Sequence, residues 1–239
     1  MGEGSTAGGL RIQRGRQRRG TVPAPSCQTV ISTFESSFIR MSSQLQTESG
    51  LSTVVREAAE GRLPAWTQAK PTRREHMARV AGLMRAWATA LELPADEVAR
   101  WSAAGYLHDV LRDAPADELR PHVPPEFRDL PGKLLHGPAA AARLDGQADD
   151  ELLDAIRCHT LGCPRFGALG RALYLADFLE PGRTFTPEWT ESLRRRMPGE
   201  MDAVLREVVE ARIGHVSENG GILHPETKAF HAQVQAEAR

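Results

Sequence analysis

The sequence predicts an all-α protein, and three observations support this fold class. From about Leu51 onward, apolar residues recur at spacings of three and four, as they do on one face of a helix. Ala, Leu, Arg and Glu, which favour helices, fill these periodic segments. Runs that alternate β-branched and polar residues, the usual sign of strands, are not found. We therefore expect about seven helices packed around one core.

Helices are expected where this periodicity runs between residues that start and stop helices. The predicted helices span residues 73–92, 96–112, 138–145, 150–161, 167–180, 187–196 and 199–217, and a short helix follows Pro225. Pro138 fits the first turn of the third helix, because that turn leaves its N–H groups without helical partners. Gly162 and the pair Pro181-Gly182 end the fourth and fifth helices. Residues 120–125 are rich in proline and are expected to form an ordered, non-helical cover.

Histidine and aspartate residues lie near the ends of the apolar stripes or at helix starts. In the first helix Val80 and Trp87 share a face, and His76 precedes Val80 by one turn on that face. The other residues of this kind are His108, Asp109, His136, His159 and Asp177. Each histidine taken alone could be a core residue bonded to a backbone carbonyl, and each aspartate a solvated helix cap. The whole set favours a metal site between helices, because a buried aspartate charge is unfavourable unless it is paired or metal-bound.

The chemistry of these side chains indicates which metals they bind. Imidazole and carboxylate groups suit iron, manganese, zinc or magnesium better than they suit soft metals. The set exceeds what one tetrahedral ion needs, so it can hold two ions that share a carboxylate. Two such ions can activate a water molecule and hold a phosphate oxygen against it. The sequence therefore predicts a metal-dependent hydrolase.

The order His76, then His108-Asp109, then Asp177 is similar to the signature of the HD-domain superfamily of all-helical, metal-dependent phosphohydrolases. Three further segments resemble the YqeK-type HD family, whose members are bacterial symmetrical diadenosine tetraphosphate hydrolases. These segments are Leu-His-Gly-Pro-Ala-Ala at residues 135–140, Ala-Ile-Arg-Cys-His-Thr at residues 155–160, and Tyr-Leu-Ala-Asp-Phe-Leu-Glu-Pro-Gly-Arg at residues 174–183. The likeness extends from about Ser52 to residues 223–227, which is most of the chain.

The resemblance implies an HD-domain helical bundle with a dinuclear metal site between its helices. It implies two divalent or mixed-valence metal ions, with iron favoured and manganese or another divalent metal as alternatives. The implied ligands are His76, His108, Asp109, His136, His159 and Asp177. Asp109 would bridge the ions, and a metal-bound hydroxide would split diadenosine tetraphosphate in the middle into two ADP molecules. Met77, Arg112 and Cys158 depart from the family pattern, but none of these departures removes a ligand.

Positively charged residues near these ligands are candidates for binding phosphate and for catalysis. Phosphoryl transfer spreads negative charge over the equatorial oxygens, and cations stabilise that charge. Arg112 and Arg183 are expected to act with Asp109 in catalysis and to bind substrate, because a guanidinium matches two phosphate oxygens. Lys133 is a further candidate for substrate binding, with an ordinary surface charge as the equal alternative. Three phenylalanines could stack on adenine or belong to the core, and the sequence leaves this choice open: Phe166, Phe178 and Phe185.

The composition is that of an ordinary globular protein, with 41% hydrophobic and 26% charged residues and a net charge of −1 over 239 residues. This balance argues against a dedicated nucleic-acid binder or a membrane-surface protein. No apolar run approaches the ~18 residues of a membrane span. The three cysteines give no disulfide framework and indicate a reducing compartment, so we expect a cytoplasmic location. The sequence leaves open whether the protein is a homodimer.

The first fifty residues differ in composition from the rest of the chain. Gly, Ser, Thr, Arg and Gln dominate them, and residues 11–19 hold arginines without any acidic residue. One interpretation is a basic arm that touches RNA. The other is a solvated tail or an upstream extension, since Met41 leads directly into the domain. We favour the second, and expect residues 1–50 to be a disordered extension and residues 51–239 to form the hydrolase domain.

Three functions are compatible with these observations. The first is symmetrical hydrolysis of diadenosine tetraphosphate. The second is hydrolysis of another nucleotide, such as a nucleoside mono- or triphosphate or a cyclic nucleotide, by the same kind of site. The third is a non-catalytic, metal-stabilised protein that binds RNA or a ribosome-associated partner. The complete ligand set favours the two enzymes, and the fold alone does not separate them.

Overall fold

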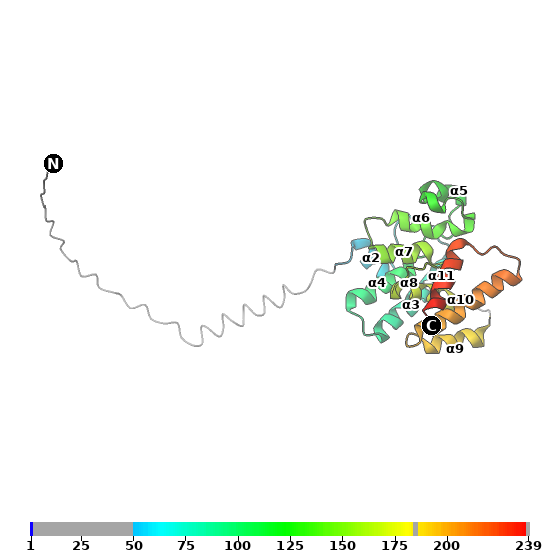
Figure 1. Ribbon diagram of the computed structural model, residues 1–239. Coiled ribbons are helices and arrows are strands. Elements are labelled where there is room, and N and C mark those ends of the chain that lie inside the picture. Colours follow the sequence, from blue (N-terminus) through cyan, green and yellow to red (C-terminus); the bar gives the residue numbers. More distant parts are fainter. Residues whose placement is uncertain (2–49, 184–185, 238–239) are drawn as a thin grey trace, which may run out of the picture. The chain divides into compact units, whose positions relative to one another are not determined.

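The computed structural model describes Met1, residues 50–183 and residues 186–237. The chain divides into two units, Met1–Glu48 and Ser49–Arg239, and the described helices lie in the second unit (Figure 1). The basic segment of residues 11–19 lies outside the described residues. The extension predicted for residues 1–50 does so too, apart from its two end positions.

The described part of the second unit consists of helices and the loops between them. The α-helices are α2 (Thr53–Ala59), α3 (Pro71–Ala90), α4 (Ala95–Leu107), α5 (Ala116–Leu119), α6 (His136–Arg143), α7 (Asp150–Cys158), α8 (Ala168–Leu179), α9 (Pro187–Arg196), α10 (Met201–Glu218) and α11 (Pro225–Ala236). Short 3-10 helices are η1 (Arg120–His122), η2 (Pro125–Phe127) and η3 (Gly132–Leu134). No strand occurs among the described residues, and the predicted all-α class is confirmed. None of the described helices combines the length and the apolar character that a membrane span requires.

Helix α8 is the most enclosed element of the fold. It contacts α3, α4, α7, α9 and α10 (Figure 1). Its consecutive residues Leu173, Tyr174 and Leu175 are all buried, although they point in different directions around the helix. A helix that is apolar all round must be covered on every side. Asp177, which lies on this helix, therefore depends on other groups inside the fold for its partners.

Helices α3 and α4 approach each other closely because small residues lie between them. A Cβ atom built at Gly105 of α4 would lie 2.5 Å from the Cα atom of Ala81 in α3. Ala103 and Ala104, beside this glycine, have no exposed surface. The close approach brings the end of α4, where His108 follows, against the helix that contains His76.

Helix α4 ends at Leu107, and the prediction that it continues to residue 112 was wrong. The backbone beyond it pairs with a distant segment instead of forming another helical turn. The N–H of Gln68 donates to the carbonyl of Val110 at 2.7 Å, and the N–H of Asp113 donates to the carbonyl of Gln68 at 3.2 Å. Asp109 lies at this break, and its side chain is buried.

Two other segments differ from their predictions. Helix α2 was not predicted, although Ser52 caps it by accepting a hydrogen bond from the N–H of Val55 at 3.4 Å. Residues 120–125 were predicted to be non-helical, but they contain η1 and the start of η2. Proline permits such single turns at their first positions, and it prevents their extension into an α-helix.

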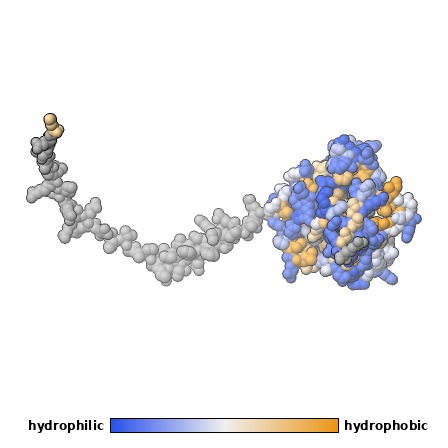
Figure 2. All heavy atoms as spheres, in the orientation of Figure 1, coloured by the Kyte–Doolittle hydropathy of each residue, from blue (hydrophilic) through white to orange (hydrophobic). Residues whose placement is uncertain are grey.

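The surface seen in Figure 2 is mainly hydrophilic, and its apolar residues form separate small groups. Small apolar groups of this kind are normal on a folded protein. The face shown carries no large apolar patch of the kind that marks a binding site.

Arg100 joins α4 to the start of α7. Its guanidinium contacts Asp149 at 2.5 Å and Glu151 at 2.8 Å. Asp149 also caps α7 by accepting a hydrogen bond from the N–H of Leu152 at 3.1 Å. Burial raises the pKa of Asp149, but hydrogen bonds from Arg100 and Leu152 outweigh this effect and hold the pKa below its usual range. The resulting stabilisation is present above the unfolded-state pKa and is lost as the pH falls through the folded-state pKa.

Replacing Asp149 with alanine is expected to lower the free energy of unfolding at pH 7 by about 1–2 kcal/mol, because a helix cap and a partner of Arg100 are lost. The difference from the wild type should shrink below a pH of about 3.9, because the unfolded chain takes up a proton there and the folded carboxylate does so only at lower pH. Urea denaturation at pH 7 and pH 3 measures both effects. The exposed control Asp145→Ala should stay within about 0.5 kcal/mol of the wild type. An equal loss at both pH values would contradict the role of the Asp149 charge.

Candidate metal centre

The structure brings all six predicted ligands together in the interior. They come from helices that are distant in sequence or from the residues that directly follow them. His76 lies in α3, His108 and Asp109 follow α4, His136 begins α6, His159 follows α7, and Asp177 lies in α8. Each of these side chains is buried. The prediction that stripe ends and helix starts converge on one site therefore agrees with the fold.

Asp109 is the central residue of this cluster, because its two carboxylate oxygens face different histidines. Its Oδ1 atom lies 3.0 Å from Nε2 of His136 and 3.5 Å from Nε2 of His159. Its Oδ2 atom lies 3.4 Å from Nε2 of His108 and 3.7 Å from Nε2 of His76. The ligand atoms in each of these two sets lie within 4.8 Å of one another. One carboxylate thus joins two sets of imidazoles.

We call His76, His108 and Asp177 the first group, and His136 and His159 the second group. Asp177 belongs to the first group because its Oδ1 atom lies 3.1 Å from Nε2 of His76 and 3.9 Å from Nε2 of His108. Asp109 is shared between the groups. The first group therefore contains a carboxylate of its own, whereas the second group has only the shared one among the described residues.

The outer nitrogen of each histidine is held by a hydrogen bond, which orients the inner one. The Nδ1 atoms of His108, His136 and His159 lie 2.8, 3.0 and 2.9 Å from backbone carbonyls three residues earlier. A carbonyl oxygen can only accept, so each Nδ1 atom carries a proton and donates it. For His108 and His159, these carbonyls belong to the last turn of a helix, where the helix itself leaves them unpaired. In the neutral imidazole, the lone pair of Nε2 then points into the cluster.

The arrangement fits a bound divalent metal. Nε2 of His76, Nε2 of His108 and Oδ1 of Asp109 are buried and make no hydrogen bond within the described residues. Nε2 of His136 and Nε2 of His159 approach to 3.1 Å. Buried acceptors without donors are unfavourable, and a cation among them would satisfy them together. Nitrogen and carboxylate oxygen are the donors that divalent metals such as iron, manganese and zinc accept.

Both aspartates are ionised in this environment. Burial raises the pKa of Asp109, but the facing imidazoles of His108, His136 and His159 outweigh it and hold the pKa well below its usual range. Burial also raises the pKa of Asp177, and His76 and Arg183 likewise outweigh it and lower the pKa far below the usual value. Burial lowers the pKa of His136 and so favours its neutral form. Burial also lowers the pKa of His108, but the carboxylates of Asp109 and Asp177 outweigh it and raise that pKa, so a metal ion at His108 would displace a proton. Ionised carboxylates and neutral imidazoles are the forms that bind metals.

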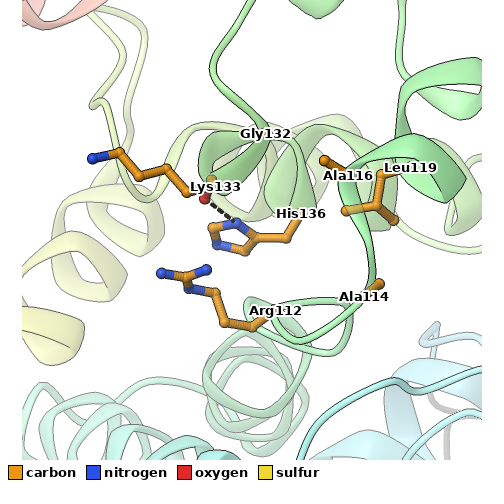
Figure 3. Close-up of a pocket in the computed structure, with 7 residues that line it drawn as sticks. All are labelled: Arg112, Ala114, Ala116, Leu119, Gly132, Lys133 and His136. Carbon is orange, nitrogen blue, oxygen red and sulfur yellow. Dashed lines mark hydrogen bonds between the residues drawn. The ribbon is translucent and has the colours of Figure 1, made fainter.

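The predicted phosphate-binding residues lie at the rim of the cluster. Arg112 and Lys133 line a cavity of about 210 Å³ together with His136 (Figure 3). The guanidinium of Arg112 lies beside the imidazole of His136, and the side chain of Lys133 extends away from the ring (Figure 3). Neither cation forms an ion pair with a carboxylate among the described residues, so both are available to an anionic ligand.

A second cavity, of about 350 Å³, lies on the side of His76 and contains the third predicted cation. Arg183 lines it and contacts Oδ1 of Asp177 at 2.5 Å. Arg73 lines it as well and contacts Oδ2 of Asp109 at 2.8 Å. Arg73 was missed in the sequence. Its position one turn before His76 on the same helix is the signal that identifies it, because residues three apart share a helix face.

The phenylalanines considered for adenine stacking have separate positions. Phe166 is buried and packs edge-to-face against Phe230 at a ring distance of 5.4 Å, as a core residue does. Phe178 packs edge-to-face with Trp189 at 5.9 Å. Phe185 lies outside the described residues. None of these contacts identifies an adenine site.

Comparison with known proteins agrees with the helical fold. The HD domain family matches residues 73–182, a range that includes all six predicted ligands. A crystal structure described as a predicted HD superfamily hydrolase involved in NAD metabolism, from Clostridium acetobutylicum, superposes with a TM-score of 0.62 at 24% identity. The superposition covers 77% of this chain and 96% of that one. At this identity the likeness concerns the fold.

Curated relatives are similar over a shorter region. A symmetrical bis(5'-nucleosyl)-tetraphosphatase from Bacillus subtilis is 36% identical over 90 residues, which are 34% of this chain and 48% of the relative. A protein of the same name from Halalkalibacterium halodurans is 28% identical over 110 residues, which are 45% of this chain and 58% of the relative. The chain thus spans about half the length of the curated relatives that it matches. The family match over residues 73–182, the helical fold and the buried histidine and aspartate cluster agree, and this part of the chain is similar to the HD domain family.

Proposed function

We propose that this protein is a metal-dependent phosphohydrolase that splits diadenosine tetraphosphate symmetrically into two ADP molecules. The observation that carries this proposal is the position of Asp109, which presents one carboxylate oxygen to each of two sets of histidines. This geometry supports a dinuclear centre with Asp109 as the bridging ligand. The names of the two curated relatives support the substrate. Iron is the metal we propose, with manganese as the alternative, because both accept a mixed imidazole and carboxylate ligand set.

The charge of the site suits a polyphosphate. Two bound divalent ions would supply a water molecule of lowered pKa and polarise a phosphoryl oxygen. The chain itself supplies cations on the side of each ligand group. Arg112 and Lys133 share a cavity with His136 of the second group, and Arg73 and Arg183 share one with His76 of the first. This arrangement supports a substrate that has phosphates on both sides of the bond to be broken.

The guanidinium groups are suited to the charge that develops during hydrolysis. Attack on phosphorus leaves negative charge on the equatorial oxygens, and arginine can donate two parallel hydrogen bonds to them. Arg183 and Arg73 already contact the ligand carboxylates, so a phosphate at the centre lies within their reach. Lys133 would act as a single point charge at the opening of its cavity.

The test uses the full chain, loaded without oxygen with Fe²⁺ and, separately, with Mn²⁺. Each sample is incubated with diadenosine tetraphosphate, and the products are resolved by ion-exchange chromatography. ADP as the sole product is expected. ATP with AMP, or orthophosphate, would contradict symmetrical cleavage. Absence of turnover by the metal-loaded protein would overturn the proposed substrate, and other nucleotides would then be tested in the same assay.

Replacing Arg112 with glutamine is expected to lower kcat/KM for diadenosine tetraphosphate by about 10²-fold, as loss of one preorganised charge-stabilising donor does. The metal content of the variant should equal that of the wild type, because Arg112 contacts no ligand carboxylate in the described structure. Initial rates with metal-loaded protein and elemental analysis measure the two quantities. Arg195→Gln, at an exposed position of α9 that pairs with Glu191, is the matched control and should stay within about twofold. A normal rate in Arg112→Gln would remove Arg112 from the proposed site.

A further inference from the structure

Glu180 is a buried carboxylate that directly follows α8. It is 3 % exposed, and three groups surround it. Its Oε1 atom lies 3.1 Å from Nδ1 of His76, and its Oε2 atom accepts hydrogen bonds from Nε of Arg79 and from the N–H of Gly182, each at 2.6 Å. The guanidinium of Arg183 pairs with Asp177, so the side-chain contacts of Glu180 are with His76, Arg79 and Gly182.

His76 differs from the other histidines of the centre in what holds its outer nitrogen. The outer nitrogens of His108, His136 and His159 donate to neutral backbone carbonyls. The outer nitrogen of His76 faces a carboxylate. A carboxylate behind a ligand imidazole fixes its tautomer and increases its basicity, and so strengthens its bond to a metal. The two ligand groups are therefore chemically unequal.

The charges of the centre add to this inequality. The first group contains the carboxylate of Asp177 and has Glu180 behind His76. The second group has no carboxylate among the described residues other than the shared Asp109. A divalent cation in the first group thus meets more negative charge and a more basic imidazole.

Neighbouring residues hold the carboxylate of Glu180 in its contact with His76. Arg79 lies one turn after His76 on α3, so both side chains reach the same carboxylate. A Cβ atom at position 182 would lie 2.4 Å from Nη2 of Arg79, so glycine lets the guanidinium lie against this turn in its present position. The turn of residues 180–182 therefore places Glu180 between a ligand and a counter-charge.

We propose that Glu180 is a positioning residue that acts through His76 and makes the first group the tighter of two metal positions. This inference rests on the dinuclear centre of the proposed function, and it adds the order in which the two metal positions fill. The position formed by His76, His108, Asp177 and Asp109 fills before the position formed by His136, His159 and Asp109.

The experiment is a calorimetric titration of the metal-free, full-length protein with Mn²⁺. The wild type is expected to bind two ions with resolved affinities. Glu180→Gln keeps the size of the side chain and removes its charge. It should weaken the tighter site by roughly 10–100-fold, as loss of a carboxylate behind a ligand histidine does, and leave the weaker site within about threefold. Electron paramagnetic resonance of samples with one equivalent of Mn²⁺ should then show ions distributed over both positions instead of one.

Arg79→Gln is the matched control, because it removes the other partner of Glu180 and leaves the contact with His76. If Glu180 only anchored the turn to α3, Arg79→Gln would weaken metal binding as much as Glu180→Gln does, and the proposal would be overturned. If Glu180 acts through His76, the affinities of Arg79→Gln should stay within about threefold of the wild type. Should Glu180→Gln fail to fold, Glu180→Asp provides the same test, since it keeps the charge and withdraws it from Nδ1 of His76.

The outcomes separate this inference from the proposed function. Glu180→Gln that binds Mn²⁺ like the wild type, while the wild type splits diadenosine tetraphosphate, overturns the role of Glu180 alone. Wild-type protein that binds two ions in order but leaves the dinucleotide intact overturns the proposed substrate and supports the order of filling.

Discussion

Replacing Asp109 with asparagine is expected to reduce hydrolysis of diadenosine tetraphosphate by about 10³-fold or more, because several kcal/mol of metal-dependent stabilisation are lost. Asp109 is the one described carboxylate whose oxygens face both ligand groups, at 3.0 Å from His136 and 3.4 Å from His108. Asparagine has nearly the same shape, but it has no charge and only one acceptor oxygen. We therefore expect the bound metal to fall from two ions per chain to at most one. Product chromatography and elemental analysis of the same samples measure both effects.

Asp129→Asn is the control for this variant, since it makes the same chemical change at an exposed position. It should retain both the metal content and the rate of the wild type. Asp109→Asn protein that still bound two ions would show that the carboxylate does not bridge them. Retention of hydrolysis by a variant with one ion would remove the second group from the reaction.

Replacing Gly105 with alanine is expected to lower the free energy of unfolding by about 2–3 kcal/mol, in the range found when atoms are forced into a packed core. The added Cβ atom would lie 2.5 Å from Cα and 2.6 Å from N of Ala81, and neither backbone atom can move without displacing α3. The displacement would also separate His76 on α3 from His108 at the end of α4. Metal affinity should therefore fall together with stability. Urea denaturation of the metal-free protein and Mn²⁺ titration measure the two effects.

Gly82→Ala is the control, and its expected change in the free energy of unfolding has the opposite sign. Gly82 lies within α3, and a Cβ atom there would have no neighbour within 4 Å. Alanine in place of an unconstrained helical glycine is expected to stabilise the protein by about 0.5–1 kcal/mol. Equal stability changes in the two variants would show that α3 and α4 can move apart at no cost. This outcome would contradict close packing as the reason for glycine at position 105.

The positions of the long helices were predictable from the sequence, and their ends were not. The apolar stripes of α3 and α8 predicted the bounds of these helices to within about two residues. Burial of one helix face requires apolar residues at a regular spacing, and this spacing is visible in the sequence. The end of α4 was misplaced because Val110 and Asp113 form backbone hydrogen bonds with Gln68. Such long-range bonds leave no periodic trace in the residues that make them. The same reason explains the missed α2, which is short and lacks a long stripe.

The sequence by itself determined which histidine and aspartate side chains need partners in the interior, because these residues lie inside apolar stripes. The sequence did not reveal how these side chains are divided between the first and the second group. The tertiary structure decided that Asp109 faces two sets of histidines, that Arg73 contacts Asp109 across 36 positions of sequence, and that Glu180 supports His76 across 104. Residue type limits the chemistry of a side chain, whereas the distances and orientations that select its partners depend on how the helices pack.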